Sequence, residues 1–71
     1  MNEQDCLLMG YLDEERNLTR TAERLYITQP ALTYRLQQIE KEFGVSIIVK
    51  DKRGIRLTPE GEFMQNEKSH H

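Results

Sequence analysis

The sequence lacks most of the features that identify extracellular, membrane or metal-binding proteins. A single cysteine, Cys6, rules out an internal disulfide and favours the reducing cytoplasm as the compartment. No apolar run approaches the roughly 20 residues that a membrane-spanning helix needs, and the first residues do not resemble a signal peptide. The two histidines, His70 and His71, adjoin each other at the C-terminal end, where they look like the remainder of a purification tag. We therefore expect no membrane partner and no metal site.

Groupings of catalytic side chains are missing as well. No histidine or cysteine accompanies a candidate nucleophile, and no phosphate-binding loop is present. A chain of 71 residues also leaves little room for a substrate pocket, because a domain of this size buries only a modest core. We therefore expect no enzyme and no cofactor.

Charge is unevenly distributed along the chain. The formal net charge is −2, although nucleic-acid-binding domains usually carry a basic surface. Residues 1–16 contribute −4 and residues 59–71 contribute −2, whereas residues 17–58 hold eight bases and four acids, a local charge of +4. Because phosphate contacts supply most non-specific affinity for DNA, so few cations predict weak binding by a single copy.

The segment from Thr28 to Gly44 predicts a helix with well-marked ends. Thr28 suits the N-cap, Pro30 suits the first turn, and Gly44 can turn left-handed and end the helix. One face of this predicted helix is apolar, and the opposite face carries polar groups, a tyrosine and a lysine. The helix is thus expected to dock by one side and to offer the other to a polar partner. Four apolar residues spaced four, three and four apart share the docking face: Leu32, Leu36, Ile39 and Phe43.

A second predicted helix precedes this one closely. Asn17 is a candidate N-cap for a helix over 18–25, and only two residues separate its end from the Thr28 cap. Two helices joined by so short a turn cross steeply, as in a helix-turn-helix. In such a unit the second helix enters the DNA major groove by its N-terminal residues, while the first crosses the backbone.

The residues after Gly44 change to a strand-like pattern. β-Branched residues predominate at 45–49, a turn signal follows at 51–54, and alternating apolar residues then resume. This pattern predicts a two-stranded hairpin, the wing of a winged helix-turn-helix. Thr58 suits the N-cap of a last helix, which is predicted over 59–66.

An N-terminal helix over 2–15 is expected to complete a three-helix core. Leu8, Met9 and Leu12 are predicted to face that core, although the alternative that its apolar residues are scattered over the surface stays open. The predicted fold is mostly α: a winged helix-turn-helix with a two-stranded β-hairpin wing and the start of a fourth, linker helix. The predicted core comprises Leu12, Leu18, Ala22, Leu25, Ile27, Leu32, Leu36, Ile39, Phe43 and Val45.

Residues 5–64 resemble, without a gap, the N-terminal domain of LysR-type transcriptional regulators. The most specific combination is Gln-Pro-Ala-Leu at 29–32, inside the helix-turn-helix, followed by Arg-Gly-x-x-Leu-Thr-x-x-Gly at 53–61. Arg16 departs from the family, which usually has glycine there, and the departure predicts that this corner needs no positive φ. The matching stretches are 17–25, 27–33, 36–40, 43–45 and 53–61.

The resemblance implies sequence-specific binding of double-stranded DNA, with the recognition helix at 28–43 in the major groove and the wing in the minor groove. It divides the chain into a winged helix-turn-helix domain at 1–58, the start of a linker and dimerisation helix at 59–66, and a tail at 67–71. In the family this last helix is long, pairs two subunits and leads into a C-terminal domain that binds an effector. The chain is therefore expected to be the DNA-binding part of a longer, dimeric, cytoplasmic regulator.

The residues expected to contact bases lie at the start of the recognition helix. The Gln29 amide both donates and accepts, which suits the major-groove edge of adenine. Pro30 and Ala31 suit contact with a thymine methyl, and Thr33 can bond to a base or a phosphate. Tyr34 is also expected to contact a base. It stands where the family often has arginine, but its phenol is uncharged, so it is not expected to reproduce the guanine contact of that arginine.

Arginine at the wing and a set of polar side chains are expected to contact the rest of the DNA. Arg53 resembles the family residue that enters the minor groove, where narrow A·T-rich tracts attract arginine; the alternative is a solvated turn cation. Phosphate contacts are predicted for Thr19, Arg20, Thr28, Arg35, Lys52 and Arg56. For Arg35 the alternative is an ion pair within the domain, and for the other residues of this set it is a solvated surface position.

A winged helix can also serve as a protein-interaction module, and the acidic net charge favours that alternative. Salt-sensitive binding to A·T-rich duplexes would separate the two, because only DNA binding releases counterions from phosphates.

Overall fold

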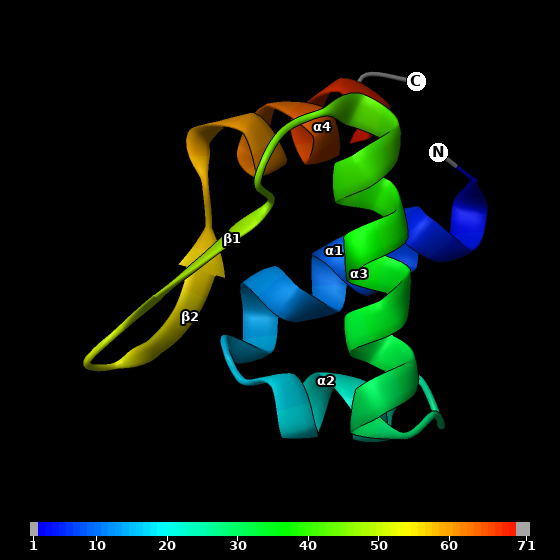
Figure 1. Ribbon diagram of the computed structural model, residues 1–71, viewed down its shortest axis with the longest axis vertical. Coiled ribbons are helices and arrows are strands. Elements are labelled where there is room, and N and C mark those ends of the chain that lie inside the picture. Colours follow the sequence, from blue (N-terminus) through cyan, green and yellow to red (C-terminus); the bar gives the residue numbers. More distant parts are fainter. Residues whose placement is uncertain (1, 70–71) are drawn as a thin grey trace.

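The computed structural model describes residues 2–69, with side chains through Gln65, and in this part of the chain four helices pack together with a short hairpin at one side (Figure 1). The pair His70 and His71 lies outside the described residues. The elements in chain order are α1 (Glu3–Glu15), α2 (Leu18–Arg24), α3 (Gln29–Phe43), β1 (Ile48–Asp51), β2 (Gly54–Leu57) and α4 (Pro59–Ser69).

The caps predicted from the sequence delimit α2 and α3. The Asn17 side chain accepts from the Arg20 N–H at 2.9 Å, and the Thr28 hydroxyl accepts from the Ala31 N–H at 3.3 Å. Each bond satisfies one donor of a first helical turn that has no partner within the helix. Gly44 ends α3 with a left-handed φ of 69°. These three local predictions are confirmed.

The corner between α1 and α2 contradicts the prediction that it needs no positive φ. Arg16 adopts a φ of 51°, although it replaces the glycine that suits this region. Its N–H donates to the Leu12 carbonyl oxygen at 2.8 Å, and its own carbonyl oxygen accepts from the Ile55 N–H at 3.3 Å. The left-handed conformation is thus required by bonds to α1 on one side and to the wing on the other, whatever side chain is present.

A second residue with a positive φ follows the end of α2. Tyr26 has a φ of 58° and its side chain is 95% exposed. Its N–H donates to the Glu23 carbonyl oxygen, and the next N–H, of Ile27, donates back to Ala22 at 3.0 Å. This is the Schellman arrangement, in which a left-handed residue reverses the chain directly after a helix. The reversal brings α3 steeply across α2 (Figure 1).

The wing is an antiparallel pair in which Ile48 lies opposite Leu57 and Asp51 lies opposite Gly54. It extends to the left of the helices in Figure 1. Because side chains alternate along a strand, Ile55 and Leu57 face inward and are buried, whereas Arg56 between them is exposed. The predicted winged helix-turn-helix is therefore confirmed as the fold.

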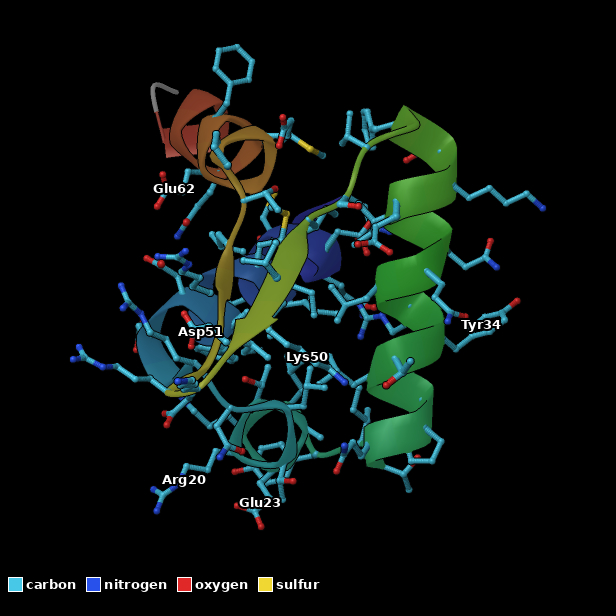
Figure 2. All side chains as sticks on the ribbon, turned by 60° about the vertical axis from the view of Figure 1, so that its left-hand side comes forward. Arg20, Glu23, Tyr34, Lys50, Asp51 and Glu62 are labelled. Carbon is cyan, nitrogen blue, oxygen red and sulfur yellow. The ribbon has the colours of Figure 1, made fainter. Side chains whose placement is uncertain are left out.

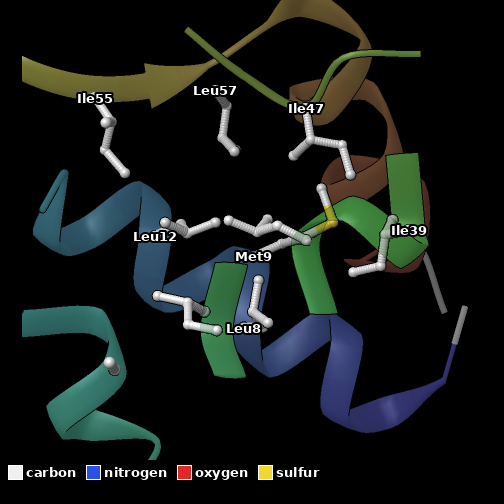
Figure 3. Packing of buried hydrophobic residues seen from close by; sticks show 10 residues of the cluster. Leu8, Met9, Leu12, Ile39, Ile47, Ile55 and Leu57 are labelled. Carbon is white, nitrogen blue, oxygen red and sulfur yellow. The ribbon is translucent and has the colours of Figure 1, made fainter. Parts of the chain in front are cut away.

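The core lies between α1, α3 and the wing (Figure 3). The α1 residues Leu8, Met9 and Leu12 are at most 1% exposed, as predicted. The prediction was wrong for Phe43, which is 44% exposed, because the last turn of α3 extends past the buried cluster. Val45 is only half-buried for the same reason. The buried apolar cluster comprises Leu8, Met9, Leu12, Ala22, Leu32, Leu36, Ile39, Ile47, Ile55 and Leu57, with Leu18, Leu25 and Ile27 packed against it.

One buried hydroxyl joins the start of α4 to the segment before β1. Thr58 accepts from the Gly61 N–H at 3.1 Å, which is the predicted N-cap, and donates to the carbonyl oxygens of Ser46 and Ile47. A side chain at Gly61 would lie 2.7 Å from the Ile47 carbonyl oxygen. The helix continues to Ser69, beyond the expected end at 66, because no glycine or proline interrupts residues 62–69.

Candidate nucleic-acid interface

The first two turns of α3 present a polar face to solvent. An open hollow of about 470 Å³ on this face is lined by Gln29, Pro30, Thr33, Tyr34 and Gln37. Tyr34 is 62% exposed and projects away from the rest of the domain (Figure 2). Four of the five residues predicted to contact bases therefore lie together on one accessible surface. The fifth, Ala31, is half-buried next to it.

Gln29 is connected to the helix before it. The Thr19 hydroxyl of α2 donates to the Gln29 side-chain oxygen at 3.0 Å. Both side chains are exposed, and ten positions separate them along the chain. A residue predicted to contact phosphate is thus in direct contact with one predicted to contact a base. Sequence reasoning missed this bond, because it depends on how closely α2 and α3 approach each other.

Arg20 and Thr28 lie on exposed surface at the same end of the domain. Arg20 points outward from α2 (Figure 2). The Thr28 oxygen serves as the α3 cap, but its hydroxyl hydrogen remains available to donate to an acceptor such as a phosphate oxygen. Neither position conflicts with a phosphate contact, which stays a prediction for both.

Arg35 is engaged with α1. A nitrogen of its guanidinium lies 3.6 Å from a carboxylate oxygen of Asp5, with 26% and 18% of the two side chains exposed. The ion pair is the alternative that the sequence left open for this residue. Because the carboxylate already faces the guanidinium, a phosphate contact by Arg35 would have to compete with it.

The wing carries a cluster of cations. Lys52 and Arg53 form its exposed tip, where the Arg53 N–H donates to the Asp51 carboxylate at 2.8 Å and fixes the turn. Arg56 makes a loose pair with the other oxygen of this carboxylate, at 3.6 Å.

A notch of about 290 Å³ beside the turn end of the wing is lined by Arg16 together with Asp51, Arg53, Ile55 and Arg56. Three arginines thus line the same notch as one carboxylate, and Arg56 is the one that pairs with it. Arg16 was not among the predicted contact residues. Its signal in the sequence was the departure from the family's glycine, but only the fold brings it to the wing.

Arg24 takes no part in this surface, because α1 engages it. Its guanidinium lies 2.8 Å from Glu14 and 3.0 Å from Glu15, and sits 3.9 Å from the centre of the Tyr11 ring. The hydrogen bond to Glu14 is the main cause that raises the pKa of Arg24 above its ordinary value. Arg24 therefore stays charged and paired on the α1 side of the domain.

The described residues provide neither a membrane-spanning helix nor a cluster of metal ligands. Across residues 2–69, no helix combines the length and the apolar character that crossing a bilayer requires. Within the same range, histidine, cysteine, aspartate and glutamate side chains nowhere gather in threes as a metal ion would need.

Known proteins are similar to this chain in sequence and in fold. The HTH-type transcriptional regulator YraN of Bacillus subtilis (strain 168) is 47% identical over 64 residues, which are 90% of this chain and 22% of that protein. A BenM_DBD complex with benA site 1 DNA is 28% identical, with a TM-score of 0.85 over 99% of this chain and 79% of that one. A CbnR_DBD–DNA complex is 27% identical, with a TM-score of 0.84 over 99% and 80%.

The family model that matches describes a bacterial regulatory helix-turn-helix protein of the lysR family and covers residues 10–62. The chain spans about a fifth of the length of the curated relatives it matches. Residues 10–62, which the family model covers, run from within α1 through α2, α3 and the wing into the first turn of α4. The chain therefore belongs to the lysR family of bacterial regulatory helix-turn-helix proteins.

Proposed function

We propose that this chain binds double-stranded DNA sequence-specifically as the DNA-binding part of a LysR-type transcriptional regulator. One observation carries the proposal: the exposed polar start of α3 belongs to a fold shared with BenM_DBD and CbnR_DBD, both of which are known in complex with DNA. In this arrangement α3 enters the major groove by its N-terminal turns, and α2 crosses the backbone.

Base readout falls to the exposed start of α3. The Gln29 amide pairs with an adenine edge, and Tyr34 offers one hydroxyl where a longer cation would reach guanine. Pro30 and Ala31 supply apolar contact for a thymine methyl. Thr33 is half-buried, so its short side chain contacts only a base or phosphate that comes close to the helix.

The wing and the flanking helix position the domain on the duplex. Arg53, at the exposed tip, enters the minor groove, where a narrow A·T-rich groove concentrates negative potential. Lys52, Arg56 and Arg20 contact phosphates, which fix register without reading sequence. Arg35 contributes less, because Asp5 competes for its guanidinium.

The complete protein is proposed to be a cytoplasmic dimer that joins two such domains through α4 and binds its effector in a C-terminal domain. An apolar hollow of about 400 Å³ supports a packing role for this part of α4: it is lined by Phe43, Val45, Pro59, Glu60, Phe63 and Met64. Because specific interfaces usually bury more than about 1,000 Å², two copies of this chain alone are expected to associate weakly.

Fluorescence anisotropy with a labelled A·T-rich duplex tests the function. Binding is expected to be weak and to weaken further as salt rises, because few cations contact phosphate. Selection of bound sequences from a random duplex library should then yield a defined half-site. A wing that binds protein instead of DNA would give no salt-sensitive anisotropy change and no enriched sequence.

A further inference from the structure

We propose that Thr19 is a positioning residue that holds the Gln29 amide ready to read a base, and that it is not a phosphate contact. The inference rests on the proposed function, since it concerns how the base-reading side chain is presented. It replaces the role that the sequence suggested for Thr19.

The bond between these residues is anchored at both ends. Thr19 lies in the first turn of α2, whose N-terminus is fixed by the Asn17 cap, and Gln29 is the first residue of α3, directly after the Thr28 cap. The 3.0 Å contact therefore joins two backbone positions that are themselves held by hydrogen bonds. Only the two side chains have to be ordered to form it.

A glutamine amide needs such a partner in order to discriminate between bases. The torsion at the end of its side chain has a broad distribution, so an unrestrained amide samples many orientations of its donor and acceptor. The Thr19 hydroxyl donates its one hydrogen to the carbonyl oxygen of the amide. This bond directs the oxygen of Gln29 toward α2 and leaves its NH₂ group pointing elsewhere.

The remaining hydrogen-bonding capacity of Gln29 matches adenine. A carbonyl oxygen has two lone pairs, and the one that Thr19 does not use can accept from the N6 amino group of adenine. The NH₂ group can donate to N7 of the same base. Thr19 thus fixes the amide without removing either half of the bidentate contact, and binding requires less ordering of the side chain.

The test replaces the hydroxyl by a methyl group in Thr19→Val and restores it in Thr19→Ser. Relative affinities are measured for four duplexes that differ only at the base pair whose preference is lost in Gln29→Ala. Thr19→Val is expected to reduce discrimination at this base pair by roughly 2- to 12-fold, the range that corresponds to one hydrogen bond. Thr19→Ser should keep it, and the slope of affinity against salt should not change.

The double substitution of Thr19 and Gln29 tests whether Thr19 acts on base discrimination through Gln29. In the Gln29→Ala background, Thr19→Val should change discrimination no further, because its partner is gone. A uniform loss of affinity for all four duplexes, with a shallower salt slope, would make Thr19 a phosphate contact and overturn the proposal. If Gln29→Ala itself left base preference unchanged, the assignment of α3 as the reader would fail together with this inference.

A measurement without DNA separates the inference from the proposed function. Nitrogen relaxation of the side-chain NH₂ groups reports their mobility in the free chain. The Gln29 group should be more restricted than that of Gln37, which lies on the same face of α3, and Thr19→Val should abolish the difference. Equal mobility of the Gln29 group in the unsubstituted chain and in Thr19→Val would overturn the positioning role even if the chain binds DNA as proposed.

Discussion

The carbonyl oxygen of Arg16 lies 2.7 Å from the point where a β-carbon on Gly54 would stand. The corner after α1 and the first residue of β2 therefore approach each other backbone to backbone. The neighbouring Ile55 N–H donates to this same oxygen at 3.3 Å, which fixes the turn end of the wing on the corner between α1 and α2. Gly54 also has a φ of 124°, a conformation that side chains disfavour.

Gly54→Ala is expected to destabilise the domain by about 1–3 kcal/mol, because the added methyl meets a backbone oxygen and the backbone is strained as well. Urea melts measure the free energy of unfolding. Gly10→Ala is the matched control. Gly10 lies inside α1, where an added β-carbon would lie 3.9 Å from Nε2 of Gln65, and this change should stabilise by about 0.5–1 kcal/mol. Similar effects of the two substitutions would contradict the close approach of Arg16.

Leu36→Ala should cost about 2–5 kcal/mol, as large-to-small changes in a core do. Leu36 is 4% exposed at the centre of the docking face of α3. Leu7→Ala, at a position that is 48% exposed, should cost much less in the same urea melts. A loss below about 1 kcal/mol for Leu36→Ala would mean that α3 does not dock by this face.

Tyr26→Gly is expected to stabilise the domain by up to about 1 kcal/mol. Tyr26 has a left-handed φ that costs roughly 1–2 kcal/mol for a side-chain-bearing residue, while glycine loses more chain entropy on folding. Tyr26 is 95% exposed, so little packing is lost. Thermal unfolding followed by circular dichroism measures the change, and a clear loss of stability would reveal a role for the ring.

Arg53→Ala should weaken binding to duplexes with A·T-rich flanks by about 1–3 kcal/mol, and binding to G·C-flanked duplexes by less, because only a narrow minor groove attracts the guanidinium strongly. Anisotropy titrations of the two duplex types give both values. Lys52→Ala is the adjacent control and should weaken both types equally. Equal losses for Arg53→Ala would assign it to the phosphates as well.

Local signals in the sequence predicted the helix boundaries well. Asn17, Thr28 and Gly44 act within one turn of their own positions, so their residue types suffice to predict their roles. The spacing of apolar residues also identified the docking face of α3. It could not show that Phe43 lies beyond the core, because spacing gives direction around a helix and not the extent of its neighbours.

The sequence did not predict the contacts between helices and strands. The positive φ of Arg16 follows from its bonds to both α1 and the wing, and the bond from Thr19 to Gln29 follows from the crossing of α2 and α3. The pairing of Arg35 with Asp5 likewise joins α3 to α1. Residue types marked all of these positions as polar surface, but only the fold decides which polar groups meet.

The Thr58 hydroxyl bonds both to the first turn of α4 and to the segment before β1, so the positions of α4 and the wing depend on each other. The Ile47 carbonyl oxygen accepts from both the N–H and the hydroxyl of Thr58, at 2.8 and 3.2 Å, so α4 begins on the same atom that precedes β1. Gly61 packs against this oxygen too closely for any side chain to intervene. A displacement of the start of α4 therefore has to move the segment that leads into β1, or break the hydrogen bonds of Thr58.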